Sequence, residues 1–242
     1  MNRKYLAFDI ETAKVLPENE PDWNSHRPLR ISCAATLLAD SDELVLWHGG
    51  ADRKFPADRM SQQEAAALVE YLVAQAENGY TIVTWNGMGF DFDILAEESG
   101  MLAECKRLAV EHVDMMFHVL CRLGYGVKLD AAAKGMGLAG KTEGMNGAVA
   151  PVLWTEGKRE EVLQYVAQDV RTTMDVATVC EACGAMRWFA RSGKLRSMAL
   201  TKGWLTVEAA VRLPLPNTSW MDDPWPREKF TGWMQVAPTA QG

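Results

Sequence analysis

Two acidic residues lie two positions apart near the start of the chain, in the segment Phe8-Asp9-Ile10-Glu11. Apolar side chains alternate there with a period of two, which predicts a strand over residues 4–11. Side chains two apart on a strand leave the same face, with Cα atoms ~6.6 Å apart. Carboxylates so placed can bind one hard cation such as Mg²⁺ or Mn²⁺. The alternative is a strand end that carries two solvated acids.

A third acid, Asp91, follows the turn-forming segment Asn86-Gly87-Met88-Gly89-Phe90. We expect it after a strand over residues 80–85 and at the start of a helix over residues 90–98. An aspartate in the first turn of a helix also stabilises the helix dipole, so helix capping is the alternative role. Asp93 competes with Asp91 for any chemical role.

Tyr165 and Asp169 lie four residues apart in a helical pattern that runs from about residue 158 to 190. At that spacing the two side chains stack on one face of the helix, one turn apart. The alternative is an amphipathic boundary at which the tyrosine is half-buried and the aspartate is solvated.

The elements that would position these residues follow a recognisable order. We expect three antiparallel strands over residues 4–11, 31–38 and 43–47, followed by a helix that begins with the capping box Ser61 and Glu64 and ends at Gly79. Asp114 is expected to cap a further helix that stops at Gly124, with short helices over residues 124–150. Strands, a helix, a strand and then helices predict an α/β fold with a mixed sheet.

Taken together, the three motifs resemble those of the DEDD superfamily of 3′–5′ exonucleases, the DnaQ-like branch of the ribonuclease H fold. The matching segments are Phe8-Asp9-Ile10-Glu11-Thr12, Asn86 through Asp91 with Leu95, and Tyr165-Val166-Ala167-Gln168-Asp169. The histidine type of this superfamily carries His five residues before the last Asp. Here that position is Gln164, and Tyr165 occupies the tyrosine position, so the resemblance is to the tyrosine type (DEDDy).

A narrower resemblance is to stand-alone bacterial and phage exonucleases related to the proofreading domain of family B DNA polymerases. It rests on the segments Lys128-Leu129-Asp130, Gly140-Lys141 and Gly144-Met145-Asn146-Gly147, in addition to the Tyr165 motif. It covers about residues 3–185, and the remainder is too short for a polymerase palm or fingers.

The resemblance implies a ribonuclease H-like α/β fold, a mixed central sheet flanked by helices, and two divalent metal ions, Mg²⁺ or Mn²⁺. Asp9 would bridge both ions, Glu11 and Asp169 would complete the nucleophile-side site, and Asp91 would anchor the ion on the leaving-group side. Tyr165 would orient the attacking water, because a neutral phenol donates and accepts hydrogen bonds but is a weak base. These five residues form the expected catalytic set.

Substrate contacts are expected from Thr12, Asn86, Phe90 and Lys141, and Lys128 is a further candidate for a phosphate contact. Each has a plain structural alternative. Thr12 and Asn86 could be a strand-end cap and a turn residue, Phe90 could fill the core, and the lysines could be solvated. Asp114 is expected as a helix cap first and as a support for the site second.

The composition limits what the protein can bind. Its 242 residues carry 25 Lys and Arg against 32 Asp and Glu, a formal net charge of −7. A passive nucleic-acid coat would be basic, but bound metals can supply positive charge locally in an enzyme. No apolar run approaches the ~20 residues of a membrane helix, so no membrane partner is expected. Acids near the start and five scattered cysteines favour the cytoplasm.

We expect two parts: an exonuclease domain over residues 1–190 and a C-terminal extension over residues 191–242, rich in Trp and Pro. The extension could stack single-stranded nucleic acid or pack back onto the domain, and packing is the expectation. The predicted activity is 3′–5′ hydrolysis of single-stranded or frayed nucleic acid, with DNA slightly favoured over RNA. The alternatives are an oligoribonuclease-like enzyme and a nuclease-fold binding module without turnover.

Overall fold

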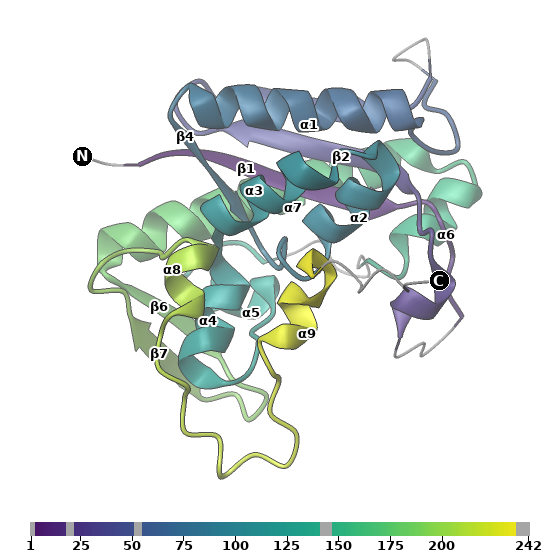
Figure 1. The fold of residues 1–242 in the computed structure, drawn as a ribbon. Helices are drawn as coiled ribbons and strands as arrows, with labels where there is room; N and C mark the ends of the chain where they lie inside the picture. Colours follow the sequence, from purple (N-terminus) through teal and green to yellow (C-terminus); the bar gives the residue numbers. More distant parts are fainter. Residues whose placement is uncertain (1–2, 18–21, 51–54, 141–146, 236–242) are drawn as a thin grey trace.

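The computed structural model describes residues 3–17, 22–50, 55–140 and 147–235. Its centre is a five-stranded sheet in the order β3-β2-β1-β4-β5 (Figure 1). The strands are β1 (Lys4–Thr12), β2 (Ile31–Leu38), β3 (Leu44–His48), β4 (Tyr80–Thr84) and β5 (Val113–Asp114). The first three are antiparallel, whereas β4 runs parallel to β1 and β5 parallel to β4. The predicted α/β class with a mixed sheet is therefore confirmed.

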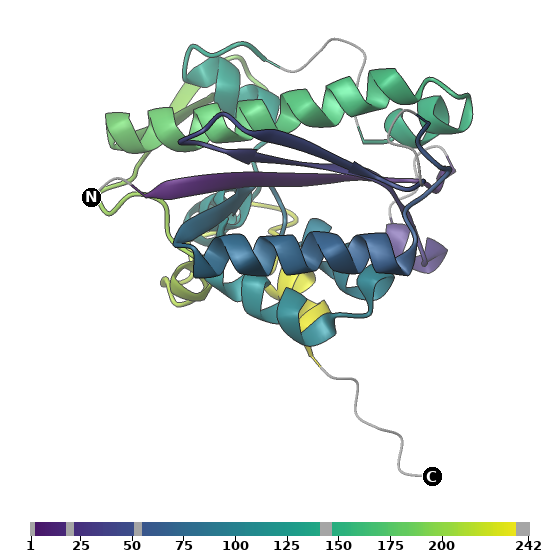
Figure 2. The same ribbon diagram turned by 90° about the horizontal axis from the view of Figure 1, so that it is seen from above.

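Both faces of β1 are buried, and its alternate side chains join two different apolar clusters. Leu6, Phe8 and Ile10 join one apolar cluster, and Tyr5 and Ala7 join the other. Figure 2 shows the resulting layers, with α7 (Arg159–Cys183) on one side of the sheet and α1 (Gln62–Glu77) on the other. Because β1 is central and covered on both faces, its acidic carboxyl end is enclosed by neighbouring elements.

The helix signals in the sequence have the expected geometry. Ser61 and Glu64 form the complete capping box at the start of α1. Asp114 caps α4 (Met115–Leu123) by accepting a hydrogen bond from the backbone N of Phe117, and Gly124 ends this helix in the left-handed region at φ 83°. The other helices before α7 are α2 (Asp91–Ser99), α3 (Leu102–Glu111), α5 (Leu129–Gly135) and α6 (Ala150–Thr155).

The long helix expected over residues 158–190 ends earlier than predicted. α7 stops at Cys183, because Gly184 adopts φ 64°, and the chain continues as the hairpin β6 (Ala185–Phe189) and β7 (Leu195–Ala199). Met186 and Trp188 of β6 alternate into the core, where this strand packs against α5. The expected domain boundary after residue 190 thus falls in the turn between two paired strands.

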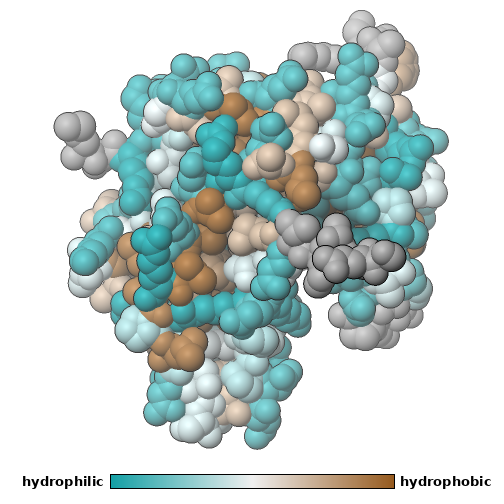
Figure 3. All heavy atoms as spheres, viewed as in Figure 1, coloured by the Kyte–Doolittle hydropathy of each residue, from teal (hydrophilic) through white to brown (hydrophobic). Residues whose placement is uncertain are grey.

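The chain after β7 contains short helices rather than a wholly extended segment: α8 (Val207–Val211), α9 (Glu228–Thr231) and the 3-10 turn η2 (Gly232–Met234). Trp204 and Phe230 are buried, whereas Trp220 is 69% exposed. Figure 3 shows a largely hydrophilic face with hydrophobic residues gathered near α8. None of the described helices is long and apolar enough to cross a membrane. The five cysteines are free thiols.

Candidate metal centre and active site

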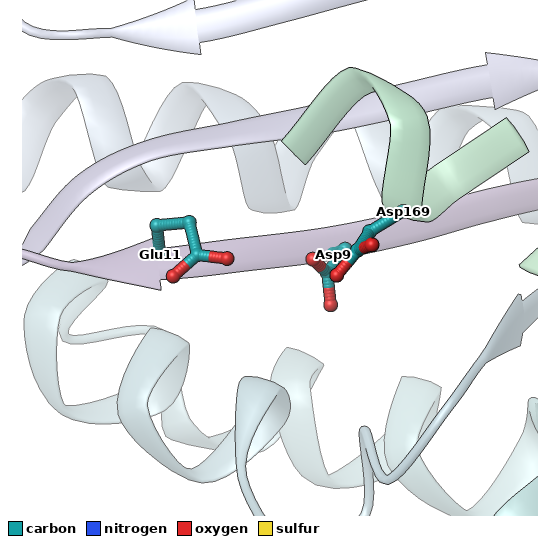
Figure 4. A group of neighbouring side chains, drawn as sticks. All are labelled: Asp9, Glu11 and Asp169. Atoms are coloured by element: carbon teal, nitrogen blue, oxygen red, sulfur yellow. The ribbon is translucent and has the colours of Figure 1, made fainter. Parts of the chain in front are cut away.

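Three carboxylates meet at the carboxyl end of β1. Asp9 and Glu11 extend from β1 and Asp169 from α7, and one carboxylate oxygen of each lies within 4.8 Å of the other two (Figure 4). On the neighbouring strand β2, Asp9 pairs with Ala35 and Glu11 with Cys33. Small side chains at these positions leave room for α7 to cross this face of the sheet. The side-chain alternation on β1 and the helical position of Asp169 therefore converge on one point.

The three acids create a negative field that reaches their neighbours. Burial raises the pKa of the Cys33 thiol well above its usual value, and the charges of Glu11 and Asp9 raise it further. Glu11 and Asp169 are each only 5% exposed. Like charges at this separation repel one another, so the cluster favours binding a cation.

Asp91 lies beside the cluster without belonging to it. Its Oδ1 accepts a hydrogen bond of 3.0 Å from the backbone N of Ile10, the residue between Asp9 and Glu11. The backbone pairing between β1 and β4 ends at Ala7 and Val83. Beyond that point, the side chain of Asp91, in place of β4, accepts a hydrogen bond from the backbone of β1. Burial raises the pKa of Asp91 to about 7, the Ile10 bond lowers it, and the charges of Asp114 and Asp169 raise it.

Tyr165 lies one helical turn before Asp169 and is 4% exposed. Burial raises the pKa of its phenol far above the usual value, and the nearby charges of Asp169, Glu11 and Asp9 raise it further. All three acids thus act on this phenol. It stays protonated at any physiological pH, which leaves it able to donate a hydrogen bond and unable to act as a strong base.

Asp114 has a second role beyond its helix cap. Its Oδ1 accepts hydrogen bonds from the backbone N of Asn86 at 3.0 Å and of Phe117 at 2.9 Å, and its Oδ2 accepts one from Met88 N at 2.9 Å. The same carboxylate therefore fixes the start of α4 and the loop that leads to Asp91. The sequence signalled only the cap, because the loop contacts depend on β4 and β5 being neighbours.

A buried histidine supports the same loop from the other side. The Thr84 hydroxyl accepts a hydrogen bond from Gly87 N and lies 3.0 Å from His112 Nε2. His112 Nδ1 lies 2.8 Å from the backbone carbonyl of Ala109, which acts as an acceptor and so assigns the proton to Nδ1. Burial lowers the pKa of His112 to about 4. His112 thus serves as a neutral structural group rather than as a member of the site.

The expected substrate residues have varied positions. Thr12 is buried at the end of β1, where the register with β2 shifts. Asn86 is half-buried and adopts φ 78°, an unusual value that the turn before Asp91 requires. Phe90 is half-buried and contacts the ring of Trp23 edge-on, with the centroids 5.3 Å apart. Lys141 lies outside the described residues.

Lys128 occupies the position before α5. Trp23 was not identified from the sequence, where it lies in a polar segment that shows no periodic pattern.

The comparison with family models gives a clear match. A model of the RNase_H superfamily matches residues 38–180, which is more than half of the chain. The chain belongs to the RNase_H superfamily. The matched segment contains Asp91, Tyr165 and Asp169, whereas Asp9 and Glu11 on β1 precede it. The expected ribonuclease H-like fold is confirmed, and the DEDD exonuclease resemblance is consistent with it.

A solved structure supports the same fold for this superfamily member, and a second, weaker match is reported beside it. The family B DNA polymerase from the hyperthermophilic archaeon Pyrobaculum calidifontis matches with a TM-score of 0.54 and 20% identity, over 75% of this chain and 25% of that one. Exonuclease I in its apo form matches at a TM-score of 0.36 and 11% identity, over 88% and 66% of the two chains. This chain thus spans about a quarter of the polymerase. No curated protein sequence matches it.

Proposed function

We propose that this protein is a metal-dependent 3′–5′ exonuclease of the tyrosine DEDD type, acting on single-stranded or frayed nucleic acid, with DNA slightly favoured. The observation that carries the proposal is the convergence of Asp9, Glu11 and Asp169 within 4.8 Å of one another. Asp91 and Tyr165 complete the set, held beside the cluster by the Ile10 bond and by position on α7. The proposed products are 5′-mononucleotides.

The donor set fits a hard divalent cation, because it consists of carboxylate oxygens from a strand and a helix that the core holds in place. Asp9, Glu11 and Asp169 would hold one ion directly, with Asp9 shared with a second ion on the side of Asp91. Two such ions ~3.5–4 Å apart stabilise the attacking and the leaving oxygens of a phosphodiester. Mg²⁺ and Mn²⁺ are the proposed cofactors.

The remaining groups position the substrate and the attacking water. The Tyr165 phenol, kept protonated by burial and by the neighbouring acids, would hold the attacking water by a hydrogen bond. Asp91 accepts the hydrogen bond from Ile10 N through Oδ1, and its carboxylate is proposed to bind the second ion through Oδ2. The residues proposed to contact the terminal nucleotide include three at the carboxyl ends of β1 and β4: Thr12, Asn86 and Phe90. Lys141 is also proposed to contact it.

The test is degradation of 3′- and 5′-labelled DNA and RNA oligonucleotides with Mg²⁺, with Mn²⁺ and with EDTA. We expect stepwise shortening from the 3′ end that EDTA abolishes and that Asp169→Asn abolishes. Asp175→Asn, at an exposed position on the same helix, is the matched control and should keep full activity. Preference for short RNA would favour the oligoribonuclease-like alternative. Binding without cleavage of any substrate in Mn²⁺ would contradict the enzyme proposal and favour a binding module.

A further inference from the structure

A pocket of about 500 Å³ lies beside the loop that carries Asp91. Its walls come from three distant segments: the 3-10 turn η1 (Trp23–His26), the start of α2, and the C-terminal α9 and η2. Figures 1 and 2 show the C-terminal segment, in yellow, next to α2. The lining includes Trp23, Arg27, Gly89, Asp93, Lys229 and Trp233. We refer to it as the tail pocket.

The tail pocket opens close to the carboxylates. Gly89 lines it and precedes Asp91 by two residues, so their Cα atoms are at most about 7.6 Å apart. Asp91 in turn is bonded to the backbone between Asp9 and Glu11. A strand whose 3′ end reaches the carboxylates would therefore pass the mouth of this pocket within a nucleotide or two.

The walls are held in place without a ligand. Trp233 donates a hydrogen bond of 2.8 Å from Nε1 to the backbone carbonyl of Met88. The Trp23 ring contacts Phe90, and the guanidinium of Arg27 lies 4.8 Å from the Trp23 ring centre. Asp93 and Glu97 both pair with that guanidinium. A pocket that is already ordered loses little side-chain entropy when a ligand binds.

Gly89 is required for the C-terminal segment to close the pocket. A Cβ at this position would lie 2.4 Å from Cδ1 of Phe230 and 2.8 Å from Oδ1 of Asn86. The contact therefore depends on the absence of a side chain in the loop before Asp91. The C-terminal segment and this loop fit together as one wall of the pocket.

The lining suits a flat, polar-edged ring. Trp23 and Trp233 supply indole surface, the side-chain NH2 of Asn24 supplies a hydrogen-bond donor, and Lys229 supplies a cation. The two lining acids, Asp93 and Glu97, balance the two cations, Arg27 and Lys229, so the pocket as a whole does not act as a phosphate trap. Bases stack on aromatic side chains in single-strand binders, and only an unpaired base has a free hydrogen-bonding edge.

From these features we propose that the tail pocket binds the base of an unpaired nucleotide near the 3′ end of the substrate strand. This inference rests on the proposed exonuclease function. Trp23, Lys229 and Trp233 all lie outside the segment matched by the superfamily model. The pocket thus draws part of its lining from the flanking segments, and by this proposal the C-terminal extension takes part in substrate binding.

The experiment is a double-mutant cycle, with one change made in the protein and the other in the DNA strand. Affinities of a 5′-labelled ten-nucleotide DNA are measured in EDTA, which prevents turnover, with a single abasic site at each of the last five positions in turn. For the wild type we expect one position at which loss of the base weakens binding about tenfold, the size of one stacking contact. Trp23→Leu should weaken binding of the intact strand to the same extent and should cancel the effect of that abasic site.

Two further variants make the outcome decisive. Trp220→Leu removes an exposed indole elsewhere in the extension and should leave the abasic profile unchanged. Lys229→Ala, at an exposed position, should weaken binding without altering the thermal melt. Because this variant changes the same pocket and stays folded, its weaker binding cannot be attributed to a folding defect, as that of Trp23→Leu could be. If the losses in affinity caused by Trp23→Leu and by the abasic site add at all five positions, the tail-pocket proposal is overturned. It is also overturned if the protein binds no strand. Coupling without any cleavage in Mn²⁺ would instead contradict only the exonuclease proposal.

Discussion

A tyrosine and four acids share a small volume at the carboxyl end of β1, and their chemistry depends on distance and burial rather than on residue type alone. Tyr165 is held neutral beside three carboxylates, while Asp91 is tied to the strand backbone. Substitutions that change one functional group can separate these roles, so single substitutions test the catalytic proposal.

Tyr165→Phe removes only the phenolic oxygen and keeps the buried ring. We expect kcat to fall by about 10²-fold, the low end for a positioned proton-transfer or orienting group, with little change in KM. The control is Tyr80→Phe, whose hydroxyl bonds Asp40 at the opposite end of the sheet and should not affect kcat. Wild-type turnover in Tyr165→Phe would assign Tyr165 a purely structural role.

Asp9→Asn tests metal binding without an activity assay. A ligand that binds only the native state adds about 2.7 kcal/mol to the free energy of unfolding at a hundredfold excess over Kd. Mn²⁺ should therefore raise the Tm of the wild type, measured in thermal scans against EDTA. Asp9→Asn relieves repulsion, so it should melt at or above the metal-free wild type and respond little to Mn²⁺. A full Mn²⁺ shift in this variant would place the metal elsewhere.

His112 should make folding sensitive to mild acid. Burial lowers its folded-state pKa to about 4, below the ~6.5 of an unfolded histidine. Between these values the unfolded chain binds the extra proton at this residue, so the contribution of His112 to the free energy of unfolding decreases as the pH falls from about 6.5 towards 4, by about 2 kcal/mol at pH 5. In urea titrations at pH 7.5 and 5, the free energy of unfolding of the wild type relative to that of His112→Gln should be about 2 kcal/mol lower at pH 5 than at pH 7.5.

The matched control for this titration is Gln63→Ala at an exposed position of α1, which changes no ionisable group and should keep the wild-type pH dependence. Asp91 and Asp114 act in the opposite direction, because burial raises their pKa values to about 7 and about 6. Asp91 and Asp114 contribute equally in the wild type, in His112→Gln and in the control variant. The difference in pH dependence between the wild type and His112→Gln therefore reports on His112. An equal change in the free energy of unfolding of the wild type and of His112→Gln between the two pH values would contradict the low pKa assigned to His112.

At the scale of elements, one carboxylate joins the loop over residues 86–90 to the start of α4. Asp114→Ala would leave the backbone N–H groups of Asn86, Met88 and Phe117 without this acceptor. Each buried unsatisfied group costs about 1–3 kcal/mol, so we expect the free energy of unfolding to fall by at least about 3 kcal/mol. Asp114→Asn keeps part of the acceptor and should be milder, yet it should lower kcat because the loop leads to Asp91.

Thr206→Ala is the control for this loss of a cap. Thr206 caps α8 by accepting a hydrogen bond from Ala209 N, and its removal should cost about 1 kcal/mol without changing kcat. Urea titration measures both variants alongside steady-state kinetics. If Asp114→Asn retains the wild-type kcat, the loop does not depend on this carboxylate for its position.

At the scale of the whole molecule, the contacts between the C-terminal extension and the α/β body include those of one arginine and one buried aromatic ring. Arg227 donates hydrogen bonds to the carbonyl oxygens of Val211, Leu213, Pro214 and Cys121. Phe230 is buried against Phe117 and Gly89. Cys121 and Phe117 belong to the α/β body, so Arg227 and Phe230 each connect the extension to it.

Phe230→Ala should therefore destabilise the entire protein. Removing a buried phenylalanine costs about 3–5 kcal/mol, which corresponds to a fall in Tm of roughly 6–20 °C for a chain of this size. The control is Trp220→Ala in the same extension, which is 69% exposed and should melt within a degree or two of the wild type. Equal melting of both variants in calorimetry would show that the extension is not part of the cooperative unit.

Features that depend on neighbours along the chain could be predicted from the residues alone. Period-two alternation located β1, the capping box located α1, and spacing of two and four residues placed Asp9 with Glu11 and Tyr165 with Asp169 on common faces. These signals are local, because backbone geometry alone sets where a side chain two or four residues away must point. The α/β class followed from the order of the elements.

The tertiary structure decided what depends on partners distant in the sequence. The end of α7 at Gly184 and the hairpin β6–β7 could not be predicted, because an apolar segment there fits a helix as well as a strand until α5 packs against it. The second role of Asp114 required β5 to lie beside β4. The tail pocket required Gly89, Trp23 and Trp233 to meet from positions up to 210 residues apart, and no local pattern records such contacts.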